Sequence, residues 1–66
     1  MIQVTMYKTN NTGNLRVLVD TFVGTSQEEA LDKAAVETES INQPLVAIDH
    51  DTGQEWEWDG FEWEEL

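Results

Sequence analysis

Apolar and polar residues alternate along several stretches of the chain, and this alternation predicts an antiparallel sheet. In residues 2–9, the apolar side chains of Ile2, Val4 and Met6 alternate with Gln3, Thr5 and Tyr7, which is the period of a half-buried strand. The alternation restarts at Leu15 and continues towards Phe22 or Val23, after a turn at residues 10–14 that is rich in Asn. The first third of the chain is therefore expected to form a β-hairpin.

After Gly24, the apolar residues take helical spacing instead. Ser26 is the expected N-cap, and Glu29 three residues later completes a capping box. The helix is expected to run from about residue 27 to residue 39, and Pro44 prevents its continuation. Its inner stripe consists of Ala30, Leu31, Ala34, Ala35 and Thr38. These mostly small side chains would allow the helix to lie close to a sheet.

Residues 45–49 form a short apolar run that predicts a further strand. Residues 51–53, Asp-Thr-Gly, favour a three-residue hairpin loop with the glycine in the left-handed conformation. Pairing across this loop would place Ile48 opposite Trp56. The face shared by these two side chains would then be the buried one.

The last hairpin is predicted from Asp59-Gly60, a dipeptide that favours two-residue type I′ turns because both positions need positive φ. The expected cross-strand pairs are Trp58 with Phe61, Trp56 with Trp63, Glu57 with Glu62 and Glu55 with Glu64. One face of this hairpin would be aromatic and the other acidic.

The last two hairpins agree on which side chains are buried. The residues expected to point inward are Val46, Ile48, Trp56, Trp58, Phe61 and Trp63. The carboxylates expected to point outward are those of Asp49, Glu55, Glu57, Glu62 and Glu64. The resulting element order is ββαβββ, and the fold class is α+β. We expect a two-layer domain over residues 1–66, with an antiparallel sheet and one helix packed on one face.

Charge narrows the possible partners. Fourteen Asp and Glu against three Lys and Arg give a net charge of −11, and residues 49–66 hold eight of the acids and none of these bases. Such a charge repels nucleic acid and lipid headgroups and accelerates the encounter with basic proteins. Like charges opposite one another also destabilise a sheet. We therefore expect a basic protein partner, no direct nucleic-acid binding and no membrane association.

Few residues suggest catalysis. His50 has no cysteine or second histidine to act with, and so small a domain rarely encloses a cleft. Residues 49–53 resemble the start of a calcium loop, but residues 54 and 60 lack the glycine and glutamate that such a loop requires. The chain is therefore not expected to be an enzyme or to hold a cofactor or dedicated metal site. Weak calcium binding by clustered carboxylates remains open.

The small size, the acidity and the regular spacing of the carboxylates resemble those of phage-encoded DNA-mimic inhibitors of host nucleic-acid-binding proteins. Carboxylates on one face of a strand repeat about every 6.5–7 Å, and neighbouring strands add parallel rows. The resemblance implies a non-enzymatic inhibitor that occupies the DNA-binding groove of a basic host protein, such as an HU-like nucleoid-associated protein or a DNA-processing enzyme. It also implies action in the cytoplasm of a bacterial host cell.

The binding residues expected from the carboxylate pattern are Asp49, Asp51, Glu55, Glu57, Asp59, Glu62 and Glu64. Helix acids would either extend this array or face solvent; they are Glu28, Asp32, Glu37 and Glu39. A sheet with free edges also favours a homodimer, formed through an edge strand or through spare aromatic surface.

Two other functions stay open. Residues 24–31 resemble the strand-to-helix junction of HicB-type antitoxins, which implies a scaffold that docks a toxin. The third interpretation is a small assembly module that binds another protein.

Overall fold

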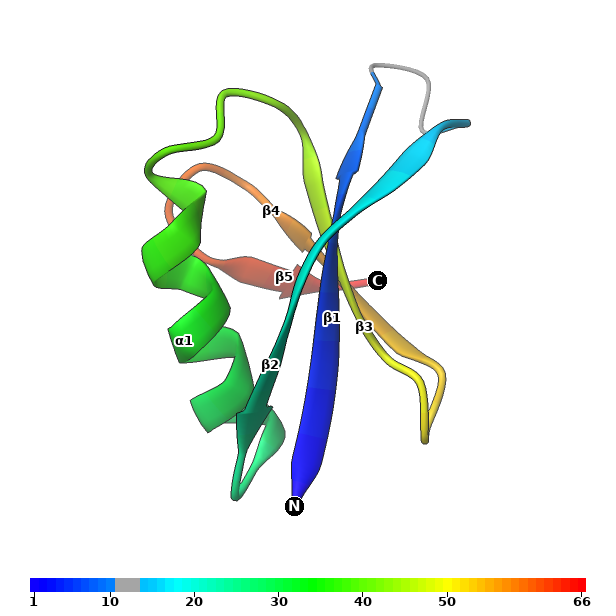
Figure 1. Cartoon of the computed structure of the whole chain (residues 1–66), viewed down its shortest axis with the longest axis vertical. Coiled ribbons are helices and arrows are strands. Elements are labelled where there is room, and N and C mark those ends of the chain that lie inside the picture. The colour runs from blue at the N-terminus through cyan, green and yellow to red at the C-terminus, as the bar shows by residue number, and fades with distance from the viewer. Residues whose placement is uncertain (11–13) are drawn as a thin grey trace.

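The computed structural model of the chain describes residues 1–10 and 14–66. Its elements are, in order, β1 (Ile2–Thr9), β2 (Arg16–Gly24), α1 (Gln27–Thr38), β3 (Leu45–Asp49), β4 (Gln54–Trp58) and β5 (Trp63–Glu65). The strands form one antiparallel sheet in the order β2-β1-β3-β4-β5. The helix α1 lies on one face of this sheet, against β2, β1 and β3 (Figure 1). The predicted α+β class and element order are confirmed.

The start of α1 follows the predicted cap in part. The Ser26 hydroxyl accepts the Glu29 backbone N–H at 3.2 Å, as expected of an N-cap. The Glu29 carboxylate instead accepts the Thr25 hydroxyl at 2.6 Å, and this hydrogen bond is the main reason why the pKa of Glu29 is lowered. Lys33, one helical turn further on, lies 3.8 Å from the same carboxylate.

The core lies between the small face of α1 and the centre of the sheet. One cluster joins Ala30 and Leu31 to Val4, Ala47 and Trp56. A second cluster joins Ala34 to Met6 and Leu45, and Ile41 and the rings of Phe22, Trp58 and Trp63 pack against it. Ala30 and Ala34 have no exposed surface, so the helix backbone lies close to the sheet as predicted.

The approach is closest at Gly24, where β2 ends. A Cβ atom on Gly24 would lie 2.8 Å from the backbone nitrogen of Ala30 and 2.9 Å from the Cβ of Glu29. No side chain fits there without a shift of the backbone.

The predicted register of β3 against β4 is wrong by one residue. Ala47 pairs with Trp56 and Ile48 with Glu55, across a four-residue loop at residues 50–53. The buried helix-side residues of β3 are therefore Leu45, Ala47 and Asp49. Val46 and Ile48, which were expected to point inward, lie on the opposite face. A one-residue slip reverses every side chain of a strand.

The predicted turn between β4 and β5 is also wrong, by two residues. Trp58 pairs with Trp63 and Glu57 with Glu64, so the connection comprises residues 59–62. A shift of two keeps each paired side chain on its expected face, and Trp56, Trp58 and Trp63 all pack towards α1. Phe61 falls in the loop instead of the core, and its side chain is 92% exposed.

The strand β2 forms the opposite edge of the sheet. Its register against β1 shifts between Met6 and Tyr7, and Val17 and Leu18 beside this irregularity are exposed. Residues 11–13 of the predicted first turn lie outside the described residues. Within the described ranges, no helix is both long and apolar enough to cross a membrane.

Candidate functional site

Carboxylates gather where the β4–β5 hairpin turns. Glu57 and Glu64 lie directly opposite each other on neighbouring strands, on the face of the sheet away from α1. Asp59 and Glu62 occupy the connecting loop, and both act electrostatically on Glu64. We call Glu57, Asp59, Glu62 and Glu64 the acidic cluster. Its members are all exposed.

Asp59 builds the loop that carries the cluster. Its Oδ1 atom accepts the backbone N–H groups of Phe61 and Glu62, each at 2.7 Å, and these bonds lower the pKa of Asp59. Gly60, which lies between Asp59 and Phe61, has a φ of 104°, a left-handed value that favours glycine. Asp59 is therefore both a structural residue and a fixed negative charge.

Glu64 experiences the accumulated charge most strongly. Its pKa is raised, first by a hydrogen bond with Asp59, then by the negative charge of Asp59, by desolvation and by the charges of Glu62 and Glu57. The neighbouring carboxylates thus disfavour the ionised form of Glu64. This response shows that the cluster is close enough for its charges to interact.

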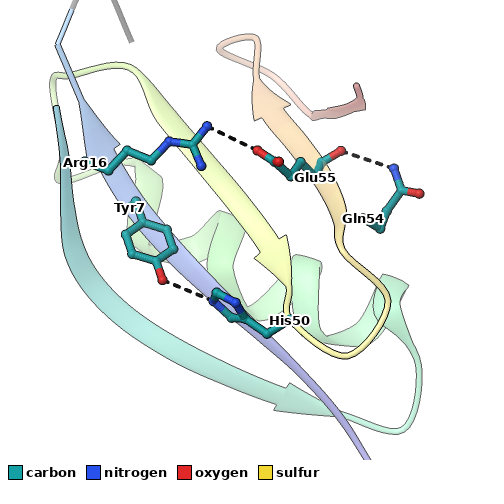
Figure 2. A network of polar contacts seen from close by, with 5 residues as sticks. All are labelled: Tyr7, Arg16, His50, Gln54 and Glu55. Carbon is teal, nitrogen blue, oxygen red and sulfur yellow. Dashed lines mark hydrogen bonds and ion pairs between the residues drawn. The ribbon is translucent and has the colours of Figure 1, made fainter. Parts of the chain in front are cut away.

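The basic residues of the described chain lie elsewhere. Arg16 reaches across the open face of the sheet to Glu55, with 3.2 Å between Nη2 and Oε1 (Figure 2). Lys33 pairs with Glu29 on α1. In the described ranges no Lys or Arg forms an ion pair with the acidic cluster. Its negative charge is therefore available to a partner.

Three carboxylates of the predicted surface lie apart from the acidic cluster. Asp51 is exposed in the β3–β4 loop, at the opposite end of β4. Glu55 is half-buried and paired with Arg16. The prediction for Asp49 is wrong, because Asp49 has no exposed surface.

The structure instead uses Asp49 to join β3 to the start of α1. Gln27 Nε2 donates to its Oδ2 at 2.9 Å, and the Asp51 backbone N–H donates to its Oδ1 at 3.0 Å. The hydrogen bond from Gln27 is the largest cause of its lowered pKa. A local signal was available in the sequence, since Asp at a strand end commonly accepts the N–H two residues later.

A second feature, on the other side of the hairpin, was not predicted. A groove of about 400 Å³ separates α1 from the β4–β5 hairpin, and the rings of Trp58, Phe61 and Trp63 line it. Glu28 and Asp32 of α1 and Glu62 of the acidic cluster also line it. We call this the aromatic groove. Sequence reasoning missed it because Phe61 was assigned to the core.

His50 has a local structural contact. The Tyr7 hydroxyl and His50 Nε2 are 3.1 Å apart, and the two rings meet edge to face, as Figure 2 shows. This contact attaches the β3–β4 loop to β1. No group of three or more His, Asp or Glu side chains within residues 1–10 and 14–66 is arranged to hold a metal ion.

Comparison with known proteins finds no protein-family model, no curated protein and no solved structure that matches this chain. Its function must therefore be argued from its own surface.

Proposed function

We propose that the protein is a non-enzymatic DNA-mimic inhibitor whose acidic cluster occupies the DNA-binding groove of a basic protein. The expected partner is a nucleic-acid-binding protein, such as an HU-like nucleoid-associated protein or a DNA-processing enzyme. The proposed place of action is the cytoplasm of a bacterial host cell, where such partners bind DNA.

The observation that supports this proposal is the direct pairing of Glu57 with Glu64. Like charges at opposed positions destabilise a sheet, and a Lys or Thr at either position would remove the repulsion. Asp59 and Glu62 add charge at the same end, and Arg16 and Lys33 pair with other carboxylates. An arrangement that opposes folding but concentrates negative charge is typical of a surface for a basic partner.

The opposed pair also concentrates charge at one edge of the sheet. Residues directly opposite each other on antiparallel strands have Cβ atoms about 4.5–5.5 Å apart, so Glu57 and Glu64 bring two negative charges close together. Because β5 is an edge strand, the cluster protrudes from the sheet without a neighbouring strand to block it.

The proposal is tested by recovery of partners from bacterial lysate. Wild-type protein serves as bait beside the E57Q/E64Q variant, which removes the opposed pair, and E37Q/E39Q, which removes equal charge from the exposed end of α1. We expect wild type and E37Q/E39Q to recover a DNA-binding protein that excess duplex DNA displaces. E57Q/E64Q should lose it, although its thermal midpoint should rise by about 1–4 °C as repulsion is relieved.

Three results would contradict the proposal: the wild type recovers no DNA-binding protein, E57Q/E64Q still recovers the partner, or both variants lose the partner equally. A partner whose binding is unaffected by salt and by duplex DNA would instead favour a toxin-docking antitoxin or an assembly module.

We also propose a homodimer formed through β2. The edge at β5 carries the acidic cluster, so two copies would repel each other there. The edge at β2 has exposed apolar side chains at Val17 and Leu18 and a cation at Arg16. Pairing through β2 would cover unpaired backbone groups and leave both acidic clusters free.

Analytical ultracentrifugation checks the dimer. We expect twice the chain mass for wild type, and a monomer for Leu18→Lys, whose side chain is too exposed to be needed for folding. A wild-type chain that stays monomeric at high concentration rules out the dimer.

A further inference from the structure

The aromatic groove combines features that suit one kind of ligand. Its walls are the rings of Trp58, Trp63 and Phe61, and its rim carries Glu28 and Asp32 from α1 and Glu62 from the β4–β5 loop. Apolar walls alone would suit an apolar ligand. Carboxylates alone would suit any cation. The two together favour a cation that also covers aromatic surface.

The rings are held in place before any ligand arrives. Trp63 Nε1 donates to the Leu31 carbonyl oxygen at 3.0 Å, which fixes its indole against α1. The rings of Trp58 and Trp63 meet edge to face at 63°, with their centroids 5.0 Å apart. Because the indole N–H of Trp63 is already bonded, this side chain offers its π surface and not a hydrogen-bond donor. Fixed rings reduce the entropy lost on binding.

Phe61 is the most unusual member of the groove. Its side chain is 92% exposed, in a loop whose shape is set by two hydrogen bonds to Asp59. The fold gains little from an exposed phenylalanine, and exposed apolar residues beside a groove commonly mark a contact surface. Phe61 therefore provides an argument for binding that does not depend on charge.

The rim carboxylates lack basic partners in the described chain. Glu28 and Asp32 are one helical turn apart and exposed, and the ion pairs on α1 and across the sheet involve Glu29 and Glu55 instead. Three uncompensated carboxylates repel phosphate, lipid headgroups and acidic side chains. The occupant is thus expected to be cationic.

We infer that the aromatic groove binds an arginine side chain of the protein partner. A guanidinium is planar, stacks on aromatic faces and donates to carboxylates at its edges, which an ammonium group does less well. The groove volume is at the low end for ligand sites, with room for one long side chain. The acidic cluster would meet the basic groove of the partner, and the aromatic groove would take one arginine at its border.

The identity of the partner rests on the proposed function, but the groove can be tested without that partner. The probe is the peptide acetyl-Gly-Arg-Gly-amide, and its control is the same peptide with citrulline, which has nearly the same shape and no charge. The readout is the set of tryptophan indole N–H resonances in ¹H–¹⁵N spectra of the isotope-labelled protein. We expect saturable shifts at Trp58 and Trp63 with the arginine peptide, and much smaller shifts with citrulline.

Variants separate the two components of the site. Phe61→Ala removes an exposed ring, so the variant should still fold. It should weaken binding of the arginine peptide about 2- to 30-fold. E28Q/D32N should weaken binding of the arginine peptide at least about threefold. E37Q/E39Q removes the same charge from α1 outside the groove and should have a much smaller effect. E57Q/E64Q should still bind the peptide.

The inference is overturned if no indole shift saturates, if citrulline binds as well as arginine, or if E37Q/E39Q weakens binding as much as E28Q/D32N. Failure of the proposed function looks different. In that case the arginine peptide still binds, but no DNA-binding protein is displaced by duplex DNA. Conversely, if the protein recovers a partner that duplex DNA displaces but does not bind the arginine peptide, the proposed function is supported and the arginine site is overturned.

Discussion

Carboxyl groups in this protein act in different ways at the scale of single residues. Asp49 is buried and accepts hydrogen bonds from α1 and from its own loop. Asp59 shapes the β4–β5 loop while it remains exposed. Glu57 and Glu64 face each other on neighbouring strands. The role of each acid therefore depends on its position in the fold.

Removal of the Asp49 carboxylate tests its structural role. Asp49→Ala leaves the Gln27 amide and the Asp51 N–H without a partner, so the thermal midpoint should fall by at least about 5 °C. Asp51→Ala, which changes an exposed side chain in the same loop, should shift it by less than about 3 °C. Scanning calorimetry of both variants decides the matter. Equal effects would show that Asp49 is no more important than a surface acid.

The pKa shifts predict how stability depends on pH. The raised pKa of Glu64 means that its folded form binds a proton more readily than the unfolded chain, so its contribution is present below its ordinary value of 4.5 and is lost as pH rises through the folded pKa. The lowered pKa values of Asp49 and Asp59 have the opposite sign. Their contributions are present above 3.8 and are lost as pH falls through the folded pKa values.

Stability should therefore rise as the solution is acidified from neutral pH and fall again in acid, where Glu29, Asp49 and Asp59, whose pKa values are all lowered, take up protons. Urea unfolding at a series of pH values measures this curve. Glu64→Gln should flatten the rise, whereas Asp49→Asn should flatten the acid decline. A curve that falls steadily from neutral pH in the wild type would contradict the raised pKa of Glu64, and a curve that keeps rising below pH 3.8 would contradict the lowered pKa values of Asp49 and Asp59.

At the scale of elements, local signals predicted α1 and failed for the register of β3 to β5. The Ser26 cap and the small stripe of α1 depend on neighbouring residues; the cap is confirmed, and so is the stripe except for the half-buried Ala35. Residues 45–48 of β3 are all apolar, so alternation could not tell which face is buried. Asp59 also overrode the expected two-residue turn, because its side chain stabilises a longer loop.

These errors had unequal consequences for the candidate site. The two-residue shift kept Glu57 and Glu64 on the outer face but replaced the partner of Glu57, and it moved Phe61 out of the core. The one-residue slip of β3 buried Asp49. The acidic character of the last hairpin was predictable from charge alone. The aromatic groove was not, because it depends on how the hairpin packs against α1.

Gly24 tests the close packing between β2 and α1. Gly24→Ala places a Cβ 2.8 Å from the Ala30 backbone nitrogen, which cannot move without shifting the helix. We expect a loss of about 1–3 kcal/mol in the free energy of unfolding. Val23→Ala, at the neighbouring and partly exposed position, is the control and should lose less. A Gly24→Ala variant as stable as wild type would mean that helix and sheet are further apart.

At the scale of the whole molecule, charge and fold divide the surface. The net charge of −11 is concentrated towards the C-terminal hairpin, which forms one edge of the sheet. The other edge, at β2, carries exposed apolar side chains and Arg16. The proposed functions follow this division, with partner binding at the acidic end and self-association at β2.

Competition with DNA tests the central claim most directly. A partner recovered from lysate is purified, bound to fluorescently labelled duplex DNA and titrated with this protein while anisotropy is followed. We expect complete displacement of the DNA, an apparent affinity that weakens steeply as salt rises, and loss of displacement in E57Q/E64Q but not in E37Q/E39Q. A ternary complex in which partner, DNA and this protein remain bound together would contradict DNA mimicry.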